Sequence, residues 1–137
     1  MEKYITSSGK EYLLKLGFLN DNNTNNFNFV ALGIGDSNAA INQGEHFNEA
    51  DGYNYTRAQL KIEDSIETTD TSIALSATFD STNFNPSDND GKQISEIGIV
   101  NQDVESDSQK WFAFLKVPQI TKTSNVSLKY TIIIGIE

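Results

Sequence analysis

The sequence holds a single histidine, His46, in the acidic segment QGEHFNEADG with Glu45, Glu49 and Asp51 close by. A zinc site usually draws on several imidazole or thiolate ligands, and the chain has no second histidine and no cysteine. A catalytic triad would need a serine activated by that histidine, but no serine lies in a G-x-S-x-G elbow. We therefore interpret His46 as a solvated loop residue.

Two other segments have the spacing of ligand-binding loops. GIGDSNAA has the glycines of a phosphate loop but lacks the Gly-Lys-Ser/Thr ending, so we expect a glycine turn there. PSDNDGKQISEI places Asp88 and Asp90 at the third and fifth positions of an EF-hand loop. Pro86 and Ile97 then occupy the first and twelfth positions, where carboxylates are needed. We expect an acidic turn, with a weak surface cation site as the alternative.

Paired carboxylates are the remaining source of chemistry. The 19 acidic residues could supply the two carboxylates of a glycosidase, but no aromatic-rich cleft pattern accompanies any pair. We predict no catalytic, cofactor-binding or metal-binding residues, no cofactor, and a non-enzymatic protein.

Charge and composition limit the partners. The 137 residues carry a net charge of −9, with nine lysines and one arginine, Arg57. Binding to nucleic acid or to anionic lipid requires clustered cations, which the sequence lacks, so we expect neither partner. No stretch has the length and apolarity of a signal peptide or a membrane span, and we expect a soluble chain made in the cytoplasm.

The elements that must position these residues are mostly strands. We expect one helix over about residues 8–16, which Ser7 or Ser8 caps and Gly17 ends, with Glu11 placed for a capping box with Ser8. From about residue 27 the apolar residues recur with a period of two, which is typical of strands. The runs are FNFVALGIG, TRAQLKIED, SIALSATF, ISEIGIV, WFAFLKV and LKYTIIIGI. The sequence predicts one domain over residues 1–137, with a β-domain over about 27–137.

Short polar connections between these runs favour antiparallel pairing. We expect an all-β fold, an antiparallel β-sandwich or flattened barrel of about six strands with one short N-terminal helix. In TRAQLKIED the alternation places one set of side chains inward, namely Thr56, Ala58, Leu60 and Ile62. It places the intervening set in solvent, namely Arg57, Gln59, Lys61 and Glu63. The predicted core includes Trp111, Leu115, Ile97, Ile132 and Ile134.

The order of these segments is more distinctive than any one of them. A G-x-x-x-L helix at Gly9 and Leu13 precedes a strand end A-L-G-x-G at Ala31–Gly35. An acidic residue and an arginine, Glu49 and Arg57, come next. An I-x-E-I-G strand, Ile94–Gly98, and a Pro-x-Ile-x-Lys element follow, the latter formed by Pro118, Ile120 and Lys122. This ordered set resembles small structural proteins of tailed phage particles, including the N-terminal domain of the tail-collar fibre family.

The resemblance implies a virion protein that assembles as a tail, neck or collar adaptor or as a fibre-attachment protein. It implies other virion proteins as partners, and a symmetric homo-oligomer. It also suggests that Arg57 pairs with Glu49 or Glu96, with a weak surface ion pair as the alternative. The sequence lacks the fibrous shaft of that family, which leads us to expect a compact adaptor or a capsid decoration protein.

Two rival functions remain open. A carbohydrate-binding or host-adhesion module would use exposed loop aromatics, for which the candidates are Tyr53, Tyr55, Phe47 and Phe84. A small hydrolase is the weaker alternative. For the structural role we expect contacts through the irregular segment 36–54 and the termini, because loops on a rigid scaffold commonly carry recognition.

Overall fold

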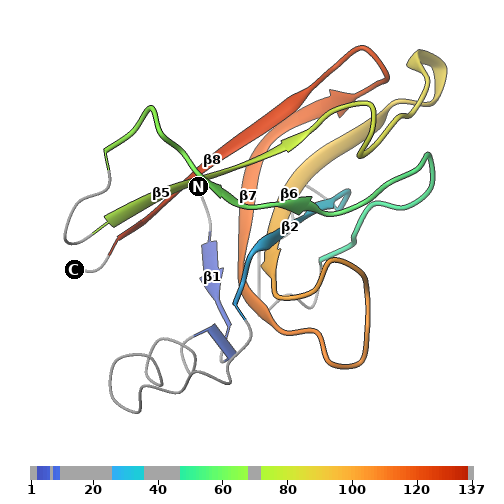
Figure 1. The fold of residues 1–137 in the computed structure, drawn as a ribbon. Coiled ribbons are helices and arrows are strands. Elements are labelled where there is room, and N and C mark those ends of the chain that lie inside the picture. Colours follow the sequence, from blue (N-terminus) through green and yellow to red (C-terminus); the bar gives the residue numbers. More distant parts are fainter. Residues whose placement is uncertain (1–2, 7, 10–25, 36–46, 68–71, 136–137) are drawn as a thin grey trace.

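The computed structural model describes residues 3–6, 8–9, 26–35, 47–67 and 72–135, and it consists mainly of β-strands (Figure 1). The strands are β1 (Lys3–Ile5), β2 (Phe29–Gly33), β3 (Ala58–Gln59), β4 (Lys61–Ile62), β5 (Ser72–Phe79), β6 (Lys92–Val100), β7 (Trp111–Lys122) and β8 (Leu128–Gly135). One 3-10 turn, η2 (Asp88–Asp90), precedes β6. The all-β prediction is confirmed over these residues, whereas most of the helix predicted at 8–16 lies outside them.

The strands form two antiparallel sheets. The larger sheet has the order β1-β7-β6-β2-β3 and the smaller one has the order β4-β5-β8. Only Leu60 separates β3 from β4, so this short segment leaves one sheet and enters the other. A strand that switches sheets in this way forms a corner between them.

The long hairpin of β6 and β7 is the centre of the larger sheet. Its register shifts twice, between Ile94 and Glu96 and again between Ile99 and Val100. Figure 1 shows β5 and β8 as a second ribbon that crosses over the larger sheet and extends beyond it.

No helix within the described residues is long and apolar enough to cross a membrane.

One hydrophobic core draws on both sheets. It includes Val30, Leu32, Ile97 and Ile99 from the larger sheet, and Ala77, Phe79, Leu128 and Ile132 from the smaller one. Of the predicted core residues, Ile97 and Ile132 are buried, and the half-buried Leu115 and Ile134 pack against the cluster. The inward face predicted for β8 is therefore confirmed over its described residues.

The placement of Trp111 in this core was wrong. At the second register shift, Ile99 faces Ala113 but Val100 faces Trp111, so β7 contains one extra residue, Phe112. Such a bulge inverts the alternation beyond it. Trp111 therefore lies on the opposite face of the sheet, against Phe114.

The alternation predicted for TRAQLKIED is confirmed only at its centre. Ala58 and Leu60 are buried, but Ile62 is 60% exposed, because β4 is an edge strand of the smaller sheet. The expectation that Arg57 and Glu63 lie in solvent was wrong, since both are buried. Each of these side chains has an ion-pair partner.

Candidate functional site

The segment before β3 is tied to the end of β2. Glu49 forms an isolated antiparallel bridge with Gly33, and Ala50 N donates to the Leu32 carbonyl at 2.8 Å. The chain then turns through Gly52, Tyr53 and Asn54, which have φ values of 74°, 52° and 62°. Three successive left-handed residues reverse the chain within a few positions. The turn signal DGYN thus brings Arg57 back toward Glu49.

Arg57 and Glu49 form a bidentate ion pair. Arg57 Nε lies 2.9 Å from Glu49 Oε2 and Nη2 lies 2.8 Å from Oε1, the parallel geometry that makes such pairs specific. Arg57 is 7% exposed and the Glu49 side chain is 22% exposed, so the pair is largely buried and the surface-pair alternative is wrong. Glu96, the other proposed partner, instead accepts a hydrogen bond from Asn48 N.

The remaining donors of Arg57 reach the β6–β7 loop. Nη1 donates to the Gln102 carbonyl at 3.0 Å and Nη2 donates to Gln109 Oε1 at 2.9 Å. The guanidinium carbon lies 5.2 Å from the ring centre of Trp111, within the range of a cation–π contact. One side chain therefore links two loops that are about 45 residues apart in the sequence.

Tyr55 completes the network. Its hydroxyl donates to Glu49 Oε2 at 2.7 Å and accepts from Leu32 N at 3.0 Å. Burial and the charge of Glu49 raise the pKa of Tyr55 far above its ordinary value. Desolvation lowers the pKa of Arg57, but the hydrogen bond and charge of Glu49 outweigh it and leave this pKa raised. Tyr55 therefore stays neutral and Arg57 stays positively charged throughout the neutral range.

An aromatic layer covers the sheet beside this network. Phe47, Trp111 and Phe114 lie with ring centres 5.1 Å apart in each pair. Gly98 makes room for them, because a Cβ there would come within 2.6 Å of Trp111 Cζ3. The glycine of the I-x-E-I-G strand is thus needed for packing.

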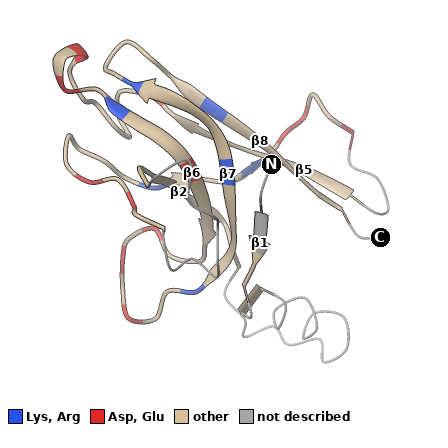
Figure 2. Ribbon diagram, turned by 180° about the vertical axis from the view of Figure 1, so that it is seen from behind, with Lys and Arg blue, Asp and Glu red and all other residues tan. Residues whose placement is uncertain are grey.

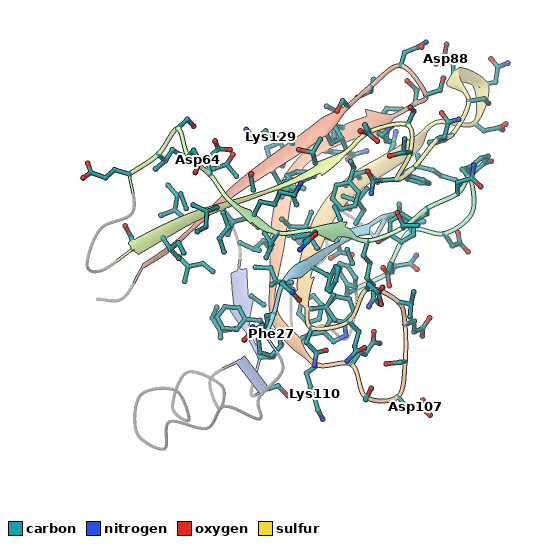
Figure 3. All side chains as sticks on the ribbon, in the orientation of Figure 1. Phe27, Asp64, Asp88, Asp107, Lys110 and Lys129 are labelled. Carbon is teal, nitrogen blue, oxygen red and sulfur yellow. The ribbon has the colours of Figure 1, made fainter. Side chains whose placement is uncertain are left out.

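Residues 49–57 and 101–110 together form a surface that we call the acidic platform. It contains an open depression of about 270 Å³. Asp51, Asp103 and Glu105 line this depression and are exposed, as is Val104. The paired Arg57 lies below them. Figure 2 shows the red carboxylate positions along these loops, and Figure 3 labels Asp107 and Lys110 at the end of the platform.

A second hollow lies between β7 and β8. It measures about 330 Å³ and is lined mainly by apolar side chains, including Leu115, Val117, Tyr130 and Ile132. The buried hydroxyl of Tyr130 has no hydrogen-bond partner among the described residues. Desolvation raises the pKa of Tyr130 to about 12.

Lys122, the lysine of the Pro-x-Ile-x-Lys element, is 0% exposed. Its Nζ donates to the Thr123 carbonyl at 2.7 Å. Desolvation lowers the pKa of Lys122, and the charge of Asp80 opposes this effect. The sequence indicated the residue but gave no sign of its burial.

The other candidate loops have mixed outcomes. His46 and most of the GIGDSNAA segment lie outside the described residues. Asp88 and Asp90 form η2, which Ser87 caps, and Asp88 accepts from Asn125 Nδ2 at 3.2 Å. The described residues contain no cluster of three or more histidine or acidic side chains that could hold a metal ion.

Three of the four proposed sugar-binding aromatics are engaged in packing. Phe84 is fully buried, Tyr55 belongs to the arginine network, and Phe47 packs against Trp111. Only Tyr53 is exposed, with Lys92 Nζ 5.6 Å from its ring centre. The sequence missed Gln109 and the main chain of Gln102 as network members, because the β6–β7 hairpin brings them there and no local pattern marks them.

Comparison with protein-family models, with curated proteins and with solved structures found no match for the chain.

Proposed function

We propose that the chain is a non-enzymatic structural component of a tailed phage particle, a tail, neck or collar adaptor or a fibre-attachment protein. We interpret its two sheets, joined at the β3–β4 corner, as a β-sandwich or flattened barrel. The observation that carries the proposal is the buried Glu49–Arg57 pair. These are the two positions that the family resemblance singles out.

The physical role of this pair fits an assembly surface. A buried ion pair adds little net stability compared with apolar residues, but it fixes geometry when all its donors are satisfied. Arg57 binds Glu49 in one loop. It also donates hydrogen bonds to Gln102 and Gln109 in the other loop, so the guanidinium fixes the two loops relative to each other. The acidic platform is therefore a rigid pair of loops, and rigid loops lose little entropy when a partner binds.

The chemistry of the platform defines its partner. Asp51, Asp103 and Glu105 provide exposed negative charge, and Val104 is an exposed apolar residue among them. The complementary virion surface should carry lysine or arginine around an apolar recess. Added salt should slow the encounter more than it weakens the final complex.

A capsid decoration protein would use the same surface, and the position in the particle distinguishes the two roles. The carbohydrate-binding alternative has less support, because it retains only Tyr53 of its four proposed aromatics on the surface.

The test is cryo-microscopy and mass spectrometry of the purified parent particle. We expect the chain at a symmetric position in the tail, neck or capsid, with the acidic platform against a basic neighbour. Absence from the mature particle would contradict the structural role and favour an assembly factor.

A charge-reversal pair tests the platform itself. Asp103→Lys with Glu105→Lys should lower incorporation into particles at least about tenfold. Asp64→Lys with Glu67→Lys is the matched control, since it makes the same charge change in the exposed β4–β5 loop. Equal incorporation of both variants would exclude the platform as the contact surface.

A further inference from the structure

The outer edge of β8 is the longest open strand edge among the described residues. β8 pairs with β5 at all eight of its positions and with no other described strand. The other three edge strands, β1, β3 and β4, are three, two and two residues long. Proteins often prevent edge-to-edge pairing by keeping their edge strands short, but β8 is eight residues long.

The ladder identifies the groups that point outward. Glu63 N donates to the Ala74 carbonyl at 2.9 Å, so the main chain of Ala74 faces β4. Successive residues of a strand alternate in direction, and Ala74 lies opposite Ile133. The main-chain groups of Ile133, and those of Thr131 and Gly135, therefore point away from β5 and toward the outer edge.

The usual protections of an open edge are absent from this one. β8 contains no proline, and its pairing with β5 has no register shift. Its one charged side chain, Lys129, is held by Glu63 with Nζ 2.6 Å from Oε2. Figure 3 labels Lys129 on this strand. An edge lysine that is paired within its own chain does little to repel an incoming strand.

We propose that two copies of the chain join edge to edge through β8, antiparallel about a two-fold axis at Ile133. The inference rests on the proposed function in one respect, the expectation of symmetric self-association. The two copies then form one continuous six-stranded sheet.

The sequence of β8 is complementary to itself in this register. Ile133 faces Ile133 of the second copy, Ile132 faces Ile134, and Thr131 faces Gly135. Ile133 is 61% exposed, and this pairing covers it with an identical β-branched side chain. Thr131 and Ile133 also line the open hollow between β7 and β8, and no described strand pairs with this part of the edge.

Charge explains why a second copy meets at this edge. Each chain carries a net charge of −9, so two copies repel each other over most of their surfaces. The segment from Thr131 to Gly135 carries no charge. Added salt should therefore strengthen the dimer by screening the repulsion between the rest of the two chains.

Sedimentation velocity of the purified chain at increasing concentration tests the proposal. We expect a monomer–dimer equilibrium that shifts toward the dimer with added salt. Ile133→Lys places two like charges opposite each other and should weaken the dimer at least about tenfold. Ile62→Lys is the matched control, because Ile62 is 60% exposed on the other edge of the same sheet. Its dimer should be unchanged.

A crosslink keeps the proposal testable even if Ile133→Lys does not fold. The chain has no cysteine, so Ile133→Cys introduces a single thiol. A short thiol crosslinker should yield a covalent dimer from Ile133→Cys and none from Ile62→Cys. A monomer at all concentrations, or equal effects of the two positions, overturns the proposal. A monomeric chain found in the particle would contradict the β8 dimer but not the structural role. A dimer that is absent from the particle would contradict the structural role but not the β8 dimer.

Discussion

Replacing Arg57 by methionine removes the four guanidinium hydrogen bonds that join the two loops of the acidic platform. Methionine keeps much of the side-chain volume, so the main loss is electrostatic rather than a cavity. Glu49 keeps the Tyr55 hydroxyl as a partner but loses both guanidinium bonds. Breaking a buried pair costs about 3–5 kcal/mol. Because the side chain of Glu49 is 22% exposed and water can reach it, we expect the lower end of this range, about 3 kcal/mol.

Urea unfolding and calorimetry measure this loss. For a chain of 137 residues, about 3 kcal/mol corresponds to a fall in Tm of roughly 10 °C. The double variant Glu49→Met with Arg57→Met leaves no uncompensated charge and should lose less than Arg57→Met alone. A single-variant loss below about 1 kcal/mol, or additive losses in the double variant, would refute the assignment of a tightly coupled buried pair.

Three further predictions concern other parts of the chain. Tyr130→Phe should not lower the free energy of unfolding, because the Tyr130 hydroxyl has no partner among the described residues, whereas Tyr55→Phe should lose about 1–2 kcal/mol in urea titrations. Gly98→Ala should displace the only tryptophan, which its new Cβ would meet at 2.6 Å, and fluorescence should report an altered emission maximum in a folded protein. Hydrogen bonds from Lys129 and the adjoining loop hold the pKa of Glu63 at about 2, below its ordinary 4.5. The stabilisation from Glu63 is thus complete above about pH 4.5 and lost toward pH 2, so the stability advantage over Glu63→Gln should shrink only in that acid range.

The period of two in the sequence was sufficient to locate the β-strands. It did not predict correctly for every residue which face of the sheet its side chain lies on. Ile97 and Ile132 lie in the core as the alternation predicts. Trp111 does not, because one extra residue in β7 inverts the alternation, and no local signal marks a bulge within a continuous apolar run. Arg57 was expected in solvent for a related reason. Alternation assigns Arg57 to the side away from the core, but Glu49, Gln109 and Trp111 cover the guanidinium there.

The network around Arg57 was only partly predictable. The resemblance indicated an acidic partner and left Glu49 and Glu96 as alternatives. The choice depends on the bridge between Gly33 and Glu49, a contact between distant segments that spacing does not encode. The role of Gln109 is harder still to predict, since its position depends on how the β6–β7 loop folds back toward Arg57. Polar networks formed from several loops are in general fixed by tertiary structure, and a single sequence shows only their most distinctive members.

The distribution of cations connects the two proposed surfaces. Arg57 and Lys122 are buried, so these two positive charges contribute little to the exposed surface. The acidic platform exposes Asp51, Asp103, Glu105 and Asp107 against one lysine, Lys110, so its attraction to a basic partner weakens as salt screens it. The β8 edge is the opposite case, because two acidic copies meet there through an uncharged strand, and the same screening strengthens their contact. The two surfaces should therefore respond to salt with opposite signs. This difference allows each to be measured in the presence of the other.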